Sequence, residues 1–140
     1  CLLSRGLGDV YKRQIYKQCE VIKMNVKEYL IEEQGFNVGQ SNTITSTKGC
    51  TWFLYRRTTK ETNKLCLTND KKPQIGVFYY EVEVNGHVHT SYEVEIVQEN
   101  NLSWINFSYY GLSESDMLLN FDKIEQSLIQ AWEASWEITK

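Results

Sequence analysis

Near Gly111, the hydrophobic residues of this chain change from the spacing of β-strands to that of an α-helix, and this change limits the folds open to it. Between Cys50 and Gly111, aromatic and β-branched residues occupy every second position or short continuous runs, which is typical of β-strands. After Gly111, the apolar residues recur with the period of an α-helix, and they are Phe121, Ile124, Leu128, Ala131 and Trp132. Strands followed by one long amphipathic helix predict an α+β fold, in which the helix packs across one face of the sheet.

Polar residues occupy the other side of this long helix, and we expect them to face solvent. They are Asp122, Glu125, Gln126 and Glu133. The start of the helix has two interpretations, because Ser113 or Ser115 is suited to capping an early start and Asn120 to capping a late one. Residues 113–120 therefore belong either to the helix or to the connection before it.

A short helix is predicted ahead of the strands, beginning after Asn25, whose side chain is suited to capping. Its apolar residues share one face, and they are Val26, Tyr29 and Leu30. Gly35 predicts its end. The complete expectation is a short N-terminal helix, an antiparallel meander of about five strands and the long C-terminal helix.

The first strand is expected over residues 50–58, and a shorter one over residues 64–68 is expected to form a hairpin with it. The run from Trp52 to Tyr55 is apolar at every position, which indicates burial on both faces. The first strand is therefore predicted to be central in the sheet or covered by a helix.

Two later turns set the predicted register of the sheet. Apolar residues favour even positions on both sides of Asn85-Gly86, so a three-residue loop over residues 84–86 is needed to place them on one face. That loop pairs Glu83 with His87 and Glu81 with His89. At Asn100-Asn101, a two-residue turn is expected to pair Ile96 with Ile105.

This register groups four possible metal ligands on one exposed face. They are His87, His89, Glu81 and Glu83. Imidazoles at alternate strand positions point the same way, and with a cross-strand carboxylate they suit Zn²⁺ or a similar ion. The favoured alternative is ordinary charge pairing on a solvated hairpin.

Basic residues gather between positions 56 and 72, where the net charge is +4 although the chain as a whole carries −3. They are Arg56, Arg57, Lys60, Lys64, Lys71 and Lys72. Such a segment, with neighbouring aromatic residues for stacking, is compatible with contacts to nucleic acid. The favoured alternative is a solvated hairpin tip.

The end of the long helix offers a possible protein-binding site. Trp136 lies near the C-terminus, where the sheet that covers the helix is expected to end, and Glu133 and Glu137 flank it. An aromatic anchor beside charged residues is typical of a protein contact. Packing in the core is the alternative interpretation of Trp136.

Motifs of common enzyme classes do not occur in the sequence: it has no Gly-x-Ser-x-Gly nucleophile elbow, no Gly-x-Gly-x-x-Gly loop and no Walker loop. We therefore expect no cofactor and no catalytic activity. We also expect no membrane partner, because no apolar run is long enough to span a bilayer.

Residues 1–14 resemble translated sequencing-adapter sequence, carried by the run from Gly8 to Gln14, and this resemblance implies nothing about fold. Residues 15–23 are ambiguous, because they belong either to the domain or to sequence upstream of the true start. Residues 24–140 are expected to form one α+β domain. We expect a small, acidic, cytoplasmic accessory protein that binds an unidentified protein, of a kind carried by phage and other bacterial mobile elements. A homodimer, a nucleic-acid-contacting module, and a metal-binding protein or enzyme that uses the His87 and His89 face are the alternatives.

Overall fold

The structure, a computed structural model, describes residues 8–40, 49–60, 73–99 and 104–138. The chain forms α1 (Asp9–Lys23), α2 (Val26–Glu32), β1 (Asn37–Val38), β2 (Trp52–Arg57), β3 (Gln74–Val84), β4 (His87–Glu99), β5 (Trp104–Leu112), α3 (Glu114–Leu119) and α4 (Phe121–Ile138). The five strands form one antiparallel sheet in chain order, as a meander.

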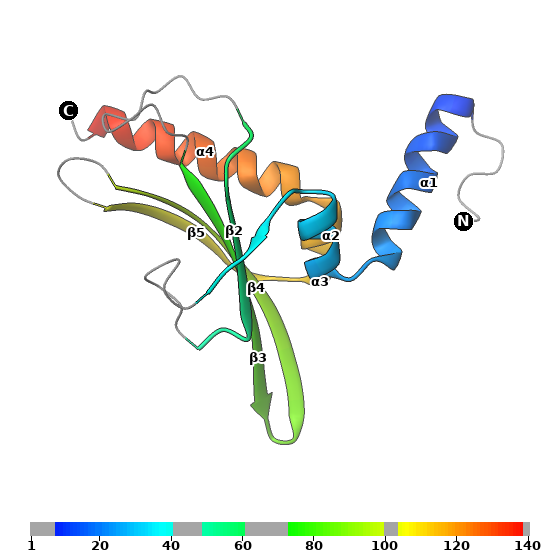
Figure 1. The fold of residues 1–140 in the computed structure, drawn as a ribbon, viewed down its shortest axis with the longest axis horizontal. Coiled ribbons are helices and arrows are strands. Elements are labelled where there is room, and N and C mark those ends of the chain that lie inside the picture. Colours follow the sequence, from blue (N-terminus) through cyan, green and yellow to red (C-terminus); the bar gives the residue numbers. More distant parts are fainter. Residues whose placement is uncertain (1–7, 41–48, 61–72, 100–103, 139–140) are drawn as a thin grey trace.

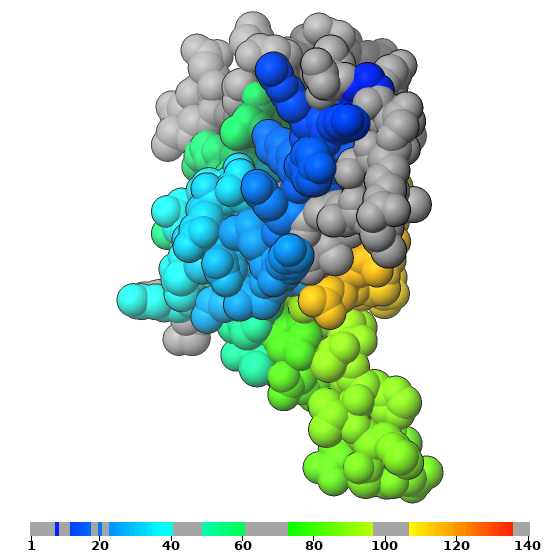
Figure 2. All heavy atoms as spheres, turned by 90° about the vertical axis from the view of Figure 1, so that its right-hand side faces the viewer, coloured from blue at the N-terminus to red at the C-terminus, as the bar shows by residue number. Residues whose placement is uncertain are grey.

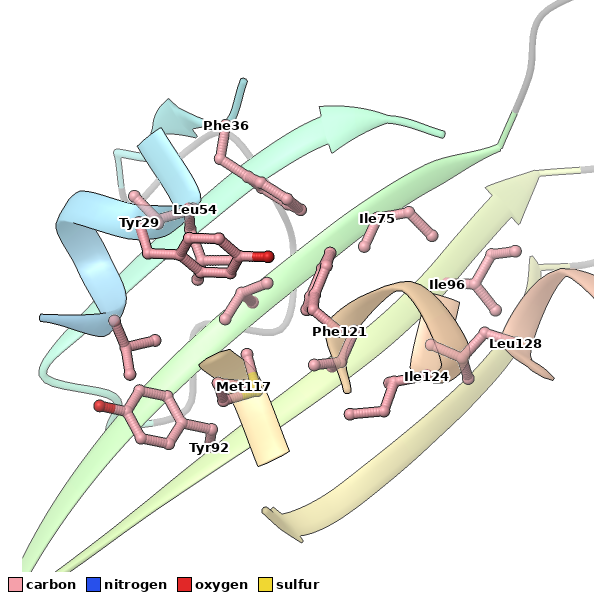
Figure 3. Packing of buried hydrophobic residues seen from close by; sticks show 14 of the residues in the cluster. Tyr29, Phe36, Leu54, Ile75, Tyr92, Ile96, Met117, Phe121, Ile124 and Leu128 are labelled. Atoms are coloured by element: carbon pink, nitrogen blue, oxygen red, sulfur yellow. The ribbon is translucent and has the colours of Figure 1, made fainter. Parts of the chain in front are cut away.

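The core lies between one face of this sheet and α4, with α2 and α3 closing one end (Figure 1). Figure 3 shows Ile75 and Ile96 of the sheet beside Ile124 and Leu128 of α4. α1 lies to one side of this body, next to α3. The predicted α+β fold, with its C-terminal helix packed across the sheet, is confirmed.

The short helix α2 forms as the sequence predicts. The Asn25 side chain accepts a hydrogen bond of 2.7 Å from the backbone N–H of Glu28, which satisfies one of the free donors at the start of the helix. Val26, Tyr29 and Leu30 are all buried. Gly35 follows with a positive φ of 72°, a conformation that suits glycine after a helix end.

Both predicted starts of the long helix exist, because the segment forms two helices. Ser113 caps α3 in a reciprocal arrangement: its hydroxyl accepts from the backbone of Asp116, whose carboxylate accepts from the backbone of Ser113. Asn120 ends α3, and α4 begins at the next residue. In α4, Trp132 is fully buried, as its place on the apolar stripe predicts.

The predicted loop between β3 and β4 is wrong. Val84 pairs with His87, and Asn85 and Gly86 both have positive φ, which defines a two-residue type I′ turn. The error arose because β3 is apolar on both faces: Val77 faces α4, whereas Phe78 is buried on the opposite face, where its ring stacks 5.8 Å from that of Phe53. Alternation alone does not identify the core face of such a strand.

The β4–β5 register differs from the prediction by two positions. Ile96 pairs with Phe107, and Glu99 pairs with Trp104, so four positions separate the strands instead of two. Between Val94 and Glu99, where the shift is two, every side chain keeps its predicted face, whereas a register irregularity between Tyr92 and Val94 makes Tyr92 pair with Leu112. In β2, Phe53 and Leu54 are buried on opposite faces, which confirms the predicted burial of this strand. The predicted strand at residues 64–68 lies outside the described residues.

Candidate functional site

The β3–β4 hairpin extends well beyond the rest of the sheet. β2 pairs with β3 only as far as Tyr79, and β5 pairs with β4 only as far as Tyr92. Beyond these positions, the two strands pair with each other up to the turn. We call residues 81–90 the β-arm; Figures 1 and 2 show it as a narrow projection from the body.

Every residue of the β-arm is exposed, including its three valines. The exposed fractions are 53% for Val82, 47% for Val84 and 62% for Val88. A two-stranded ribbon has little stability in water by itself, and valine gains stability in a strand mainly when a neighbouring surface covers it. The arm therefore exposes valine side chains that no described element covers.

The two faces of the β-arm differ in chemistry. Val82 pairs with His89, and Val84 pairs with His87. These two valines and both histidines therefore share the face away from α4. The other face carries Glu81, Glu83, Val88 and Thr90.

This arrangement separates the four predicted metal ligands. His87 and His89 lie on one face of a two-stranded ribbon, and Glu81 and Glu83 lie on the other, because the turn has two residues instead of three. Among the described residues, no group of three or more histidine, cysteine, aspartate or glutamate side chains is placed to hold a metal ion.

Three aromatic rings form the base of the β-arm on its α4 side. The ring centroids of Trp52 and Tyr79 are 5.1 Å apart, and those of Tyr79 and Tyr92 are 4.9 Å apart. The Lys27 ammonium lies 5.7 Å from the Trp52 ring. Trp52 and Tyr79 are half-buried, so this cluster continues the exposed surface of the arm into the body.

Two acidic groups, Glu81 and Glu114, also lie near this aromatic base. The Tyr79 hydroxyl donates a hydrogen bond of 2.9 Å to Glu81, which fixes the carboxylate beside the ring. Burial, together with the charges of the nearby Tyr79, Glu114 and Glu81, raises the pKa of Tyr92 to about 12. Burial also raises the pKa of Tyr79, and Glu81 adds to this shift. The α4 side of the arm and its base therefore combine aromatic area with negative charge.

Arg56, the first of the predicted phosphate-binding residues, is committed to the interior. Its guanidinium makes two hydrogen bonds, of 2.8 and 3.0 Å, to the carboxylate of Glu125. Both side chains are buried, and Thr58 donates a further bond of 2.7 Å to the same carboxylate. The Arg56 guanidinium also lies 4.3 Å from the Phe36 ring.

Glu125 was expected on the solvent side of the long helix, and this expectation is wrong. Burial alone raises the pKa of Glu125, but the hydrogen bonds from Arg56 and Thr58 and the charge of Arg56 outweigh it and lower the pKa below its ordinary value. The charged partner from β2 makes this position compatible with the core. Helical periodicity could not reveal a partner 69 residues away in the chain.

The remaining basic residues do not form a described cluster. Lys60 lies 3.2 Å from Asp122 of α4, and Arg57 is exposed. Lys64, Lys71 and Lys72 lie outside the described residues. The nucleic-acid interpretation therefore loses Arg56 and rests mainly on positions that the structure does not describe.

The predicted protein-binding end of α4 is only partly described. Positions 133–137 belong to the helix, and Glu133 is half-buried. The side chains of Trp136 and Glu137 lie outside the described part of the chain. This contact remains a prediction.

A second polar group lies on the sheet face away from α4. Glu93 and Glu95 are buried there, and the Tyr80 hydroxyl donates a hydrogen bond of 3.0 Å to Glu93. Burial, followed by the hydrogen bond to Glu93 and its charge, raises the pKa of Tyr80. Phe53 and Phe78 are buried on the same face, so this face of the sheet is covered as well.

The β-arm is not among the sites predicted from the sequence. Its signal was the Asn-Gly pair between two strands that are longer than their outer neighbours.

In the parts of the chain that are described, no helix is long and apolar enough to cross a membrane. Comparisons of this chain with family models, curated proteins and solved structures give no match.

Proposed function

We propose that this chain is a protein-binding module, without catalytic activity of its own, whose docking surface is the β-arm and its aromatic base. The observation that supports the proposal is the exposure of Val82, Val84 and Val88 on an ordered ribbon outside the body. A partner that covers these side chains removes apolar surface from water, which favours association.

The β-arm is also suited to binding because its conformation is already set. The type I′ turn at Asn85-Gly86 matches the twist of the flanking strands, and Tyr79 holds the carboxylate of Glu81. A partner therefore meets a surface with few rotatable groups left to order, which lowers the entropic cost of association. The location in the cytoplasm and the link to mobile-element accessory proteins are parts of the same proposal, and they rest on composition alone.

The test replaces the three valines by threonine, as V82T/V84T/V88T. Threonine keeps the shape and the strand propensity of valine but removes much of its apolar surface. The matched control is Leu119→Thr, which removes a similarly exposed apolar side chain at the end of α3, outside the β-arm and its three aromatic residues. A partner isolated with the parent chain, and then purified, is titrated against all three proteins by calorimetry.

We expect the triple variant to lose roughly tenfold or more in affinity, whereas L119T retains the parent value. Equal affinities of the parent and the triple variant would refute the β-arm as the docking surface. In that case the Trp136 end of α4 becomes the next candidate.

A further inference from the structure

We propose that the free edge of β3 in the β-arm binds an extended basic segment of the partner as an added antiparallel strand. This inference rests on the proposed function and specifies the chemistry of the partner. It follows from three properties of the arm: the direction of the backbone groups of β3, the room beside them, and the side chains that flank them.

The direction of the backbone groups follows from the turn. In a type I′ hairpin, the residues that flank the turn form a hydrogen-bonded pair, here Val84 and His87. Because such pairs alternate along antiparallel strands, Glu81 and Glu83 direct their backbone N–H and C=O groups away from β4. Tyr79 has the same parity, and its carbonyl accepts a hydrogen bond of 2.7 Å from Thr51, on the β2 side.

The second property is the position next to these groups, on the side of β3 where β2 lies. The pairing of β2 with β3 begins at Trp52 and Tyr79, and past Tyr79 no described strand lies along this edge of β3. An added strand would occupy the sheet position that β2 would fill if it were longer. It would start beside Trp52, so the aromatic base also contacts it. Addition of a strand to an exposed edge is a common mode of peptide recognition.

The flanking side chains select the sequence of the added strand. Residues directly opposite each other in an antiparallel pair share a face. Basic residues would therefore lie opposite Glu81 and Glu83, and apolar residues opposite Val82 and Val84. The best segment thus alternates basic and β-branched residues. The charge of Glu114 raises the pKa of both Tyr79 and Tyr92, so Glu114 adds negative charge near the same base.

The same charges disfavour a second copy of this chain at this edge. Two β3 edges in antiparallel contact would bring the glutamates of one arm close to those of the other, which is destabilising. The arm segment of β4 carries no carboxylate, since its residues are His87, Val88, His89 and Thr90, so its edge lacks the selectivity for a basic segment and provides the internal control.

The experiment measures the fluorescence anisotropy of a labelled peptide that alternates lysine and valine, titrated with the full chain. A peptide that alternates glutamate and valine tests charge, and a peptide with the lysines and valines in separate blocks tests alternation. Three variants separate the contributions of the arm: Glu83→Gln removes charge only, Glu83→Pro removes both charge and an outward N–H, and Thr90→Pro removes an outward N–H from the β4 edge. Proline at outward positions leaves the β3–β4 ladder intact.

We expect the lysine–valine peptide to bind the parent most tightly of the three peptides. The substitution E83Q should weaken binding of this peptide by about threefold, because it removes one cross-strand charge pair. E83P should weaken it by at least about tenfold, and T90P should leave it unchanged. If E83P is unstable, amide exchange in the parent gives the same answer, because bound peptide should slow exchange at Glu81 and Glu83 and not at Val88.

Equal losses of peptide affinity in E83P and E83Q would overturn strand addition, since charge alone would then explain binding. A loss of peptide affinity in T90P as large as that in E83P would also overturn it. So would peptide-free self-association of the chain through the β3 edge, detected by sedimentation and abolished in E83P. If none of the peptides binds while the V82T/V84T/V88T variant still loses its partner, this inference fails and the proposed function stands.

Discussion

The two halves of the β3–β4 hairpin share strands and pairing but differ completely in burial. In the body, Ile75, Val77, Val94 and Ile96 are fully buried. Figure 3 shows Ile75 and Ile96 close to α4. In the β-arm, the same strands expose every residue. The difference lies in what surrounds the strands, because β2 and β5 end at the base of the arm. Strand formation and core formation are therefore separate properties of this hairpin.

The buried ion pair between Arg56 and Glu125 stabilises the body half, and its loss should have the largest effect on the comparison. We expect Arg56→Ala to destabilise the chain by about 3–5 kcal/mol, because Glu125 would be left charged and buried without its partner. Chemical denaturation gives the free energy of unfolding. The β-arm should keep its local structure at denaturant concentrations where the variant is still folded.

A double variant provides the control for this prediction. Arg56→Met combined with Glu125→Leu replaces the pair by apolar side chains of similar size, which should recover most of the loss. A loss below about 1 kcal/mol in Arg56→Ala alone would contradict the burial of this pair.

Two valines of β3 allow a direct comparison of its halves. Val77→Ala should cost about 2 kcal/mol, because it leaves a cavity in the core, whereas Val82→Ala should cost less than about 0.5 kcal/mol. Both substitutions make the same chemical change in the same strand. Comparable losses, measured by urea denaturation, would show that the arm is part of the cooperative core.

The fold could be predicted because its signals are local. The cap at Asn25, the apolar stripe of α4 and the alternation of β4 each lie within one element, and each formed as expected. The registers at both turns were wrong for a physical reason. Alternation does not choose between two apolar faces of β3, and it does not distinguish a shift of two positions between β4 and β5.

The candidate site was harder to predict than the fold. Glu125 was placed in solvent because its partner Arg56 lies on a distant strand, and the predicted metal group required a turn that does not form. The β-arm depends on where β2 and β5 end, which no pattern within β3 or β4 contains. Features that arise from the relative lengths of elements appear only in the assembled sheet.

Acid should lower the stability of the folded chain, because it protonates Glu125. Because its pKa is lower in the folded chain than its ordinary value of 4.5, the unfolded chain binds more protons at low pH. This contribution to stability is complete above pH 4.5 and disappears as the pH falls through the lower folded pKa. Unfolding measured as a function of pH should show the loss in the parent. Glu125→Gln should flatten the profile, and an unchanged profile would contradict the prediction.

The smallest expected effect concerns two glycines with the same conformation in different halves. Gly86 has φ 77° in the arm and Gly111 has φ 66° at the end of β5, and a Cβ at either position meets no atom within 4 Å. Alanine therefore adds only backbone strain of about 1 kcal/mol at each site. Gly111→Ala should lower the free energy of unfolding by that amount. Gly86→Ala should leave it nearly unchanged, because the tip of the arm can open without disturbing the core, while amide exchange at His87 accelerates and exchange at Ile96 does not. A global loss in Gly86→Ala as large as that in Gly111→Ala would show that the arm and the body unfold as one unit.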